Sequence, residues 1–237
     1  MERLLQDLRV ALRVLWKDRS FAVTTVATLA LCLAANVAIF AVVDGVLLKP
    51  LPFDQPDRLV RIFNKYPGAG VEIADSGVPD YFDRKAALTA AEEIAMFRQA
   101  GVTVSGSGLG EAERIQAMTV TPSFFRVLKV QPQRGQAFTE AQGEIGQEKV
   151  VILSHGFWQR VFGGRDDAIG QDLRLGGEPH RVVGVMAPGF GFLNPDIQLY
   201  RPAAFTAEEK SDDSRHSNSW QQFARLTAGA TIKQAQA

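Results

Sequence analysis

The sequence contains few of the residues that carry most metal and redox chemistry. Its 237 residues include one cysteine and three histidines. The single cysteine, Cys32, excludes an intramolecular disulfide, and a chain without disulfides is compatible with an oxidising compartment without indicating one. The histidines have neither the mutual spacing nor the cysteine partners of a zinc site; they are His155, His180 and His216. We therefore expect no metal site and no cofactor.

An excess of charge of either sign is also missing. The 26 lysines and arginines balance the 26 aspartates and glutamates, which gives a formal net charge of zero. A surface that binds nucleic acid needs clustered positive charge, so we expect no nucleic-acid partner.

Motifs for nucleotide binding and nucleophilic catalysis are missing as well. No GxxxxGK[ST] loop occurs, and the glycine-rich stretch 106–110 lies between two predicted strands. A phosphate cradle needs a helix to follow its glycines. Ser154 and His155 are neighbours, but no G-x-S-x-G elbow surrounds Ser154, which is better interpreted as a helix cap. The sequence therefore offers no catalytic constellation.

Residues 21–43 contain no charged side chain, although 22% of the whole chain is charged. Crossing about 30 Å of hydrocarbon takes about 20 helical residues, which these 23 exceed. A buried helix of a soluble domain is rarely apolar on every face over this length. A signal peptide has a shorter apolar core of about 7–15 residues and a cleavage site of small residues, which is poorly matched here. We therefore expect a retained transmembrane helix.

Basic residues predict the orientation of this helix. Five precede it and three follow it within a comparable distance, which places the N-terminus in the cytoplasm and the rest of the chain outside. Those that precede it are Arg3, Arg9, Arg13, Lys17 and Arg19; those that follow are Lys49, Arg58 and Arg61. Residues 1–20 also have an apolar leucine stripe that ends at Trp16, which is typical of a basic amphipathic helix lying on the inner surface of a lipid bilayer.

Small side chains form a strip along one side of the apolar helix. They recur at spacings of three and four at Ala27, Ala30, Ala34, Ala38 and Ala41. Membrane helices approach closely along such strips, so the strip predicts packing against further transmembrane helices; a simple abundance of alanine is the alternative. Asn36 lies on the opposite side, and its amide needs a hydrogen-bond partner in lipid.

From Asp57 onward the pattern mixes strands and helices without strict alternation, which favours an α+β class for the outside domain. The predicted strands are 58–63, two strands within 102–120 joined by the glycine-rich turn, 149–154, a hairpin over 172–190 that turns at 176–177, and 220–226. The predicted helices are 79–97, 122–128, 155–164 and 231–237, with a polar loop over 211–219. The chain then divides into a cytoplasmic amphipathic helix (1–20), a transmembrane helix with a short periplasmic extension (21–49) and the outside domain (50–237).

Segments spread over nearly the whole chain, in the same order, resemble one family. These segments are 4–53, 121–138, 150–164, 169–190 and 223–237. They are similar to MacB/FtsX-like ABC transporter permeases, and most of all to the duplicated orphan permeases with their MacB-like periplasmic core domain.

The resemblance implies a membrane protein of the bacterial inner membrane that is not itself an enzyme. Such a protein works with a cytoplasmic ATPase subunit and relays its motion to the periplasmic side for export or mechanotransmission. It also implies further transmembrane helices after the core domain. This chain ends at Ala237, so we expect a permease component with a partial core domain rather than a complete transporter.

Two other functions remain open from the sequence. One is a stand-alone, membrane-anchored module that binds a periplasmic partner or serves as an adaptor. The other is an anchored enzyme, for which a deep pocket with converging ionisable groups would be the evidence.

Overall fold

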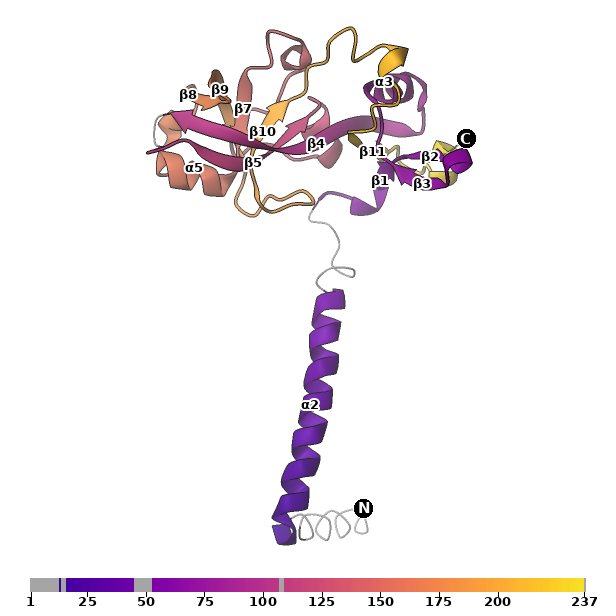
Figure 1. Cartoon of the computed structure of the whole chain (residues 1–237), viewed down its shortest axis with the longest axis vertical. Coiled ribbons are helices and arrows are strands. Elements are labelled where there is room, and N and C mark those ends of the chain that lie inside the picture. Colours follow the sequence, from indigo (N-terminus) through magenta and orange to yellow (C-terminus); the bar gives the residue numbers. More distant parts are fainter. Residues whose placement is uncertain (1–12, 14–15, 45–52, 107–108, 237) are drawn as a thin grey trace. The chain divides into compact units, whose positions relative to one another are not determined.

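The computed structural model describes residue 13 and residues 16–44, 53–106 and 109–236. The chain divides into two compact units, residues 1–52 and 53–237 (Figure 1), and each is considered by itself.

The first unit contains the apolar helix. Helix α2 spans Arg19–Val43, and its first turn is capped by Asp18, whose side chain accepts the amide N–H of Phe21 at 3.1 Å. Over Arg19–Ala41 it is the one helix of the described residues that is long and apolar enough to cross a membrane. The prediction of an apolar N-terminal helix of spanning length is confirmed. Asp44 keeps a helical backbone, whereas the predicted extension over 45–49 lies outside the described residues.

In the second unit, strand β4 (Ala91–Gly106) runs the length of the domain, with α5 (His155–Phe162) towards one end and α3 (Val78–Ala87) towards the other (Figure 1). It pairs with β5 (Glu113–Val120) over residues 97–104. The two strands are antiparallel, so the predicted pair of strands around the glycine-rich turn is confirmed.

Six strands form a closed ring of pairings, which we call the six-strand ring. From β5 the pairings run to β10 (Ile197–Pro202), β7 (Val150–Leu153), β9 (Glu178–Val185), β8 (Asp172–Leu175) and back to the last residues of β4. The β5–β10 and β7–β9 pairs are parallel and the others are antiparallel. The short strand β6 (Arg134–Gly135) adds to the outer edge of β9.

The first half of β4 belongs to a second lobe. There β4 pairs with β11 (Gln221–Leu226), and β11 pairs with β1 (Leu59–Ile62), both antiparallel. A separate hairpin is made by β2 (Asn64–Tyr66) and β3 (Val71–Ala74). The two remaining α-helices of the described residues are short: α4 (Phe124–Leu128) and α6 (Ile232–Ala235).

Three apolar clusters fill the domain. One lies inside the six-strand ring and includes Val104, Ala117 and Leu199, with α5 packed against it. A second is rich in phenylalanine and joins α4 to β4 and β11, and a third lies between α3 and β4. Because β4 contributes to all three, this strand connects every part of the core.

The mixed α+β class is confirmed, and so are most of the predicted elements, with one clear exception. Helix formers such as Ala90, Glu92 and Glu93 led the sequence pattern to extend the helix to residue 97, but α3 ends at Ala87 and β4 begins at Ala91. Residues 94–97 are buried on both faces between the second and third clusters. Tertiary packing and pairing with β11 therefore override the helical propensity of this segment.

Candidate functional site

The predicted packing strip lies on helix α2. All five of its alanines are exposed within the described chain, as is Asn36. The Asn36 side-chain amide donates to the Cys32 carbonyl one turn earlier at 2.9 Å. This bond satisfies one donor of the amide inside its own helix, while the side-chain oxygen is left to accept a bond from elsewhere.

Only three of the five predicted basic residues before the helix are among the described residues. Arg3 and Arg9 lie outside the described residues. Arg13 and Lys17 are helical and exposed, and Arg19 begins α2 after the break at Asp18. Of the predicted amphipathic stripe, Trp16 is described and is exposed.

The sheet-rich domain, residues 53–237, holds its own first residues through a buried arginine. Arg225, on β11, has only 1% of its surface exposed. Its Nε donates to the carbonyl of Val127 at 2.6 Å, and its Nη1 donates to the carbonyls of Asp54 and Gln55 at 2.8 and 3.2 Å. We call Arg225 with these three carbonyls the Arg225 tether. It fixes the first residues of the domain to β11 and to α4.

Charges around the tether strengthen this attachment. Arg58 donates through Nε to the Leu226 carbonyl at 2.8 Å and pairs with Glu92 at 2.6 Å. Lys129, just after α4, lies 3.5 Å from Asp54. Burial lowers the pKa of Arg225, and the positive charge of Arg58 lowers this pKa further. An arginine side chain still stays charged, so its bonds to the three carbonyls are charge-assisted.

An aromatic contact also fixes this end of the domain. The ring of Phe53, the first residue described after the gap, lies 6.4 Å from that of Phe190 and 6.0 Å from that of Phe192. Phe192 in turn packs against Phe124 of α4 and Phe223 of β11. The start of the domain is thus held by apolar packing as well as by the tether.

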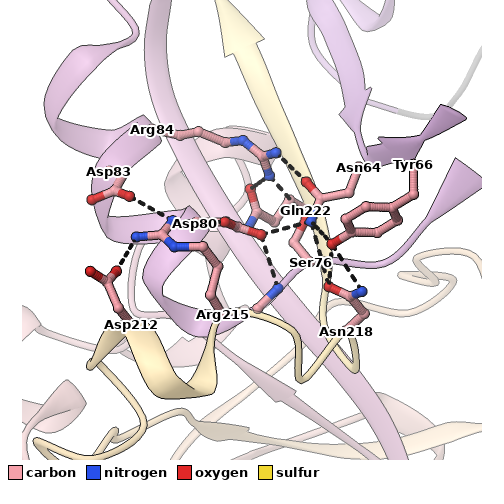
Figure 2. Close-up of polar contacts among 11 residues, drawn as sticks. Asn64, Tyr66, Ser76, Asp80, Asp83, Arg84, Asp212, Arg215, Asn218 and Gln222 are labelled. Carbon is pink, nitrogen blue, oxygen red and sulfur yellow. Dashed lines mark hydrogen bonds and ion pairs between the residues drawn. The ribbon is translucent and has the colours of Figure 1, made fainter. Parts of the chain in front are cut away.

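A polar cluster joins the β2–β3 hairpin, α3 and the loop before β11. Figure 2 shows the guanidinium of Arg84 of α3 pointing into this cluster. Arg84 donates to Ser76 at 2.9 Å, to Gln222 of β11 at 3.0 Å and to Asn64 of β2. Burial lowers the pKa of Arg84, and the nearby carboxylate of Asp80 opposes that effect. These bonds hold the hairpin, α3 and β11 together beside the third apolar cluster.

A second arginine fastens the 211–219 loop to α3 (Figure 2). Arg215 lies 3.0 Å from Asp80 and 2.8 Å from Asp83, and it also bonds Asp212. Hydrogen bonds to these carboxylates, that to Asp212 foremost, raise the pKa of Arg215. The loop predicted from its polar residues is confirmed as a loop, and its arginine is bound rather than free in solvent.

The residues considered for catalysis have structural roles. The Ser154 hydroxyl accepts the amide N–H of Phe157 at 3.2 Å and caps α5, as predicted. The His155 ring packs edge-on against Trp158, and His180 Nδ1 lies 3.0 Å from the carbonyl of Glu178. Within the described ranges, no group of three or more histidine, cysteine, aspartate or glutamate side chains is placed to hold a metal ion.

The sequence did not predict the two arginine sites, although one signal was present. The stretch 220–226 places Arg225 among Phe223, Ala224 and Leu226 in a strand that is buried on both faces. A charge inside such a run indicates a buried, hydrogen-bonded group. Its partners are about 100 and 170 residues away in sequence, and no local pattern identifies them.

Comparisons with known proteins agree with the fold. The crystal structure of the periplasmic region of MacB from Actinobacillus actinomycetemcomitans is 13% identical, covers 75% of this chain and 78% of its own, and has a TM-score of 0.55. The extracellular domain of the noncanonic ABC-type transporter YknZ from Gram-positive bacteria is 17% identical, with coverages of 75% and 88% and a TM-score of 0.54. At such identities the likeness shows the fold alone.

The sequence itself carries the family relationship. No match was found among proteins of curated function. The sequence profile of the MacB-like periplasmic core domain, however, matches residues 22–237, which is nearly the whole chain. The chain therefore belongs to the MacB-like periplasmic core domain family, as its resemblance to MacB/FtsX-like ABC transporter permeases predicts.

Proposed function

We propose that this protein is the membrane-embedded permease component of an ABC-type export or mechanotransmission system. The observation that carries the proposal is the extent of the family match. It begins at residue 22, within α2, and continues to residue 237, so the apolar helix and the sheet-rich domain belong to one family unit. In the proposal, α2 crosses the bacterial inner membrane with its N-terminus in the cytoplasm, and residues 53–237 lie in the periplasm.

The proposed partners follow from the basic residues before α2 and from the alanine strip along it. The basic residues that precede the helix contact anionic lipid or a cytoplasmic ATPase subunit, since positive charge is retained on that side. The alanine strip packs against further transmembrane helices of the same assembly. The ATPase provides the energy, and the permease carries its motion to the periplasmic side.

The Arg225 tether supports a transmission role for the domain. Asp54 and Gln55 follow α2 along the chain by about ten residues. Their carbonyls are bonded to Arg225, and Arg225 is bonded to α4. A displacement of residues 54–58 therefore moves β11 and α4 with it, because breaking charge-assisted bonds in a buried site is costly. Motion delivered to residues 54–58 would reach the core of the domain rather than be absorbed at its surface.

Site-specific photo-crosslinking in living bacteria tests the ATPase partnership. A photoreactive amino acid is placed at Lys17, before α2, and in a second strain at Asp213, which is exposed in the 211–219 loop. We expect an adduct with an ABC-type ATPase subunit from Lys17 and none from Asp213. If Lys17 gives no ATPase adduct while Asp213 captures a periplasmic protein, the chain is a stand-alone binding module and the proposal is wrong.

The orientation is tested separately with cysteine labelling. In a Cys32→Ser background, Asp213→Cys and Lys17→Cys are treated in intact cells with a maleimide that does not cross the inner membrane. The proposal predicts labelling of Asp213→Cys before lysis and of Lys17→Cys only after lysis. The reverse pattern excludes the proposed topology. Release of the chain from membranes by carbonate excludes a membrane span.

A further inference from the structure

Three polar side chains from neighbouring strands lie side by side on the inner face of the six-strand ring. Arg98 of β4 stands opposite Thr119 of β5, and Thr119 stands opposite Arg201 of β10. Side chains alternate between the two faces of a strand, so Thr119 and Arg201 share the face of Ala117 and Leu199, which are buried inside the ring. The apolar interior of the ring thus ends in a band of polar groups.

This band lines a cavity of about 190 Å³. Besides Arg98, Thr119 and Arg201, the lining includes His180 of β9 and Trp220, the residue before β11. A water molecule occupies about 30 Å³, so the cavity has the volume of roughly six waters. This is enough for one small charged group with a few attached carbon atoms.

The two arginines of the cavity have no acidic partner. Arg201 Nε donates to the Thr119 hydroxyl at 2.9 Å, which fixes its guanidinium, and the Arg98 guanidinium lies 4.5 Å from the centre of the Trp220 ring. Among the described residues, fifteen ion pairs within 4.0 Å link other arginines and lysines to carboxylates, and none involves Arg98 or Arg201. Burial and the nearby charge of Arg98 lower the pKa of Arg201. The Nη groups of both side chains remain available to a ligand.

Two glutamates also line the cavity, and both are bound elsewhere. Glu148 accepts the amide N–H of Gly146 at 2.5 Å, and Glu209 accepts that of Thr206 at 2.9 Å. Each carboxylate therefore caps its own turn rather than neutralising an arginine. Their negative charges make the cavity unfavourable for a ligand with more than one negative charge.

We propose that this cavity binds a carboxylate. The planar fork of an arginine matches the two oxygens of a carboxylate, and two guanidiniums held by Thr119 and Trp220 are preorganised to receive one. A singly charged carboxylate relieves the repulsion between the arginines, whereas the glutamates disfavour a phosphate dianion. The Trp220 ring and Pro202 form an apolar wall for the carbon atoms attached to it. The carboxylate is either the C-terminus of a polypeptide or a free small acid. The site does not depend on the proposed transport role.

Calorimetric titration of the full chain in detergent tests the ligand class. The probes are the dipeptide N-acetyl-Ala-Val, its C-terminal amide, propionate and inorganic phosphate. We expect the dipeptide acid to bind at least tenfold more tightly than the amide or phosphate. Binding of propionate with similar affinity identifies a free acid as the source, and binding of the dipeptide alone identifies a polypeptide terminus. Equal binding of acid and amide, or no binding of either acid at millimolar concentration, overturns the proposal.

Substitutions identify the site. Arg98→Gln and Arg201→Gln each remove a charged donor, and each is expected to weaken the dipeptide about tenfold or more. The matched control is Arg174→Gln, which removes an exposed arginine from β8 of the same ring and is expected to leave binding unchanged. Thermal unfolding checks that the variants are folded; Arg201→Gln without ligand is expected to be at least as stable as the natural chain, since a repulsion is removed. Unchanged affinity in both cavity variants overturns the proposal.

Discussion

At the scale of single residues, buried arginines determine how the sheet-rich domain is held together. Arg225 is almost fully buried, yet it bonds three carbonyls from two distant segments. Backbone carbonyls in turns and at helix ends need donors, and a guanidinium with five N–H groups can serve several of them at once. The residue therefore substitutes for the regular backbone pairing that these segments lack.

Replacing Arg225 with methionine tests the strength of the tether. Arg225→Met keeps much of the side-chain volume but leaves the carbonyls of Val127, Asp54 and Gln55 without this donor. Bonds to charged groups contribute about 1.5–3 kcal/mol each, partly offset by removal of a buried charge, so we expect a loss of about 3 kcal/mol in the free energy of unfolding. Urea denaturation measures the loss, and hydrogen exchange is expected to accelerate over residues 54–58. Arg174→Met serves as the control; an equal effect there contradicts the tether.

Tyr200 provides a test of burial through pH. Its side chain is 1% exposed among phenylalanines, and this burial raises the pKa of its phenol. An unfolded tyrosine ionises near pH 10 whereas the folded one does not, so the folded state loses stability as pH rises above about 10. Tyr200→Phe removes this loss. Between pH 10 and 11, the variant should gain roughly 1 kcal/mol over the natural chain in urea denaturation. Parallel pH profiles for the two proteins contradict the prediction.

The sequence predicted individual residues only where the signal was local. Ser154 was recognised as a cap because its partner is three residues away. Arg84, Arg215 and Arg225 were missed because each one bonds partners from other elements. The roles of Arg84 and Arg215 depend on the way β2, β11 and the loop before β11 come to lie beside helix α3. The role of Arg225 depends on the way β11 comes to lie beside α4 and residues 54–55. No spacing in the chain encodes either arrangement.

At the scale of elements, helix α2 gives the clearest prediction. Its five alanines follow one side of the helix, and substitution of a central alanine by a larger residue prevents close approach of another helix. Ala34→Leu is expected to lower the fraction of the chain in large membrane complexes about tenfold, as measured by native electrophoresis of gently solubilised membranes. Cys32→Leu adds bulk on the opposite side and is expected to have no effect. If both variants keep the complexes intact, the alanine strip is not a packing face.

Elements that end at glycine turns were predicted well. Glycines at 176–177 and 163–164 ended the hairpin strand and α5 as expected, because positive φ angles at these turns favour glycine. Strand β4 was partly misassigned and β10 was not predicted at all. Both are central strands with short apolar runs whose period does not separate strand from helix, and their pairing partners lie in distant segments.

At the scale of the whole domain, strand β4 joins two lobes that would otherwise be separate. Its first half pairs with β11 and its second half with β5 and β8. We therefore expect the domain to unfold in one cooperative transition. Trp158 reports on the ring and Trp220 on the other lobe, so each is followed by fluorescence in a variant where the other two tryptophans are phenylalanine.

Each of these double variants is also followed by circular dichroism, which reports on the whole fold. The prediction requires the fluorescence and dichroism midpoints to coincide within each variant. A fluorescence midpoint that differs from the dichroism midpoint of the same variant shows that the lobes unfold independently.

The overall organisation was predicted because it rests on composition rather than on contacts. An uncharged run of 23 residues and a mixed pattern after Asp57 are visible in the sequence, and the family match covers both. The closure of the six strands was not predicted, because it depends on β8 reaching the far end of β4. The order in which strands pair depends on contacts between segments that are distant in sequence, so a local pattern does not predict it.

The ring closure also limits how copies of this protein can associate. In the described nine-stranded sheet, the outermost strands are β1, with four residues, and β6, with two. Long unpaired strands are templates on which other chains add and aggregate, and short or charged ones are not. Arg61 and Arg134 occupy these two outermost strands. The nine-stranded sheet is thereby protected against intermolecular β-sheet growth, even at high local concentrations of the protein.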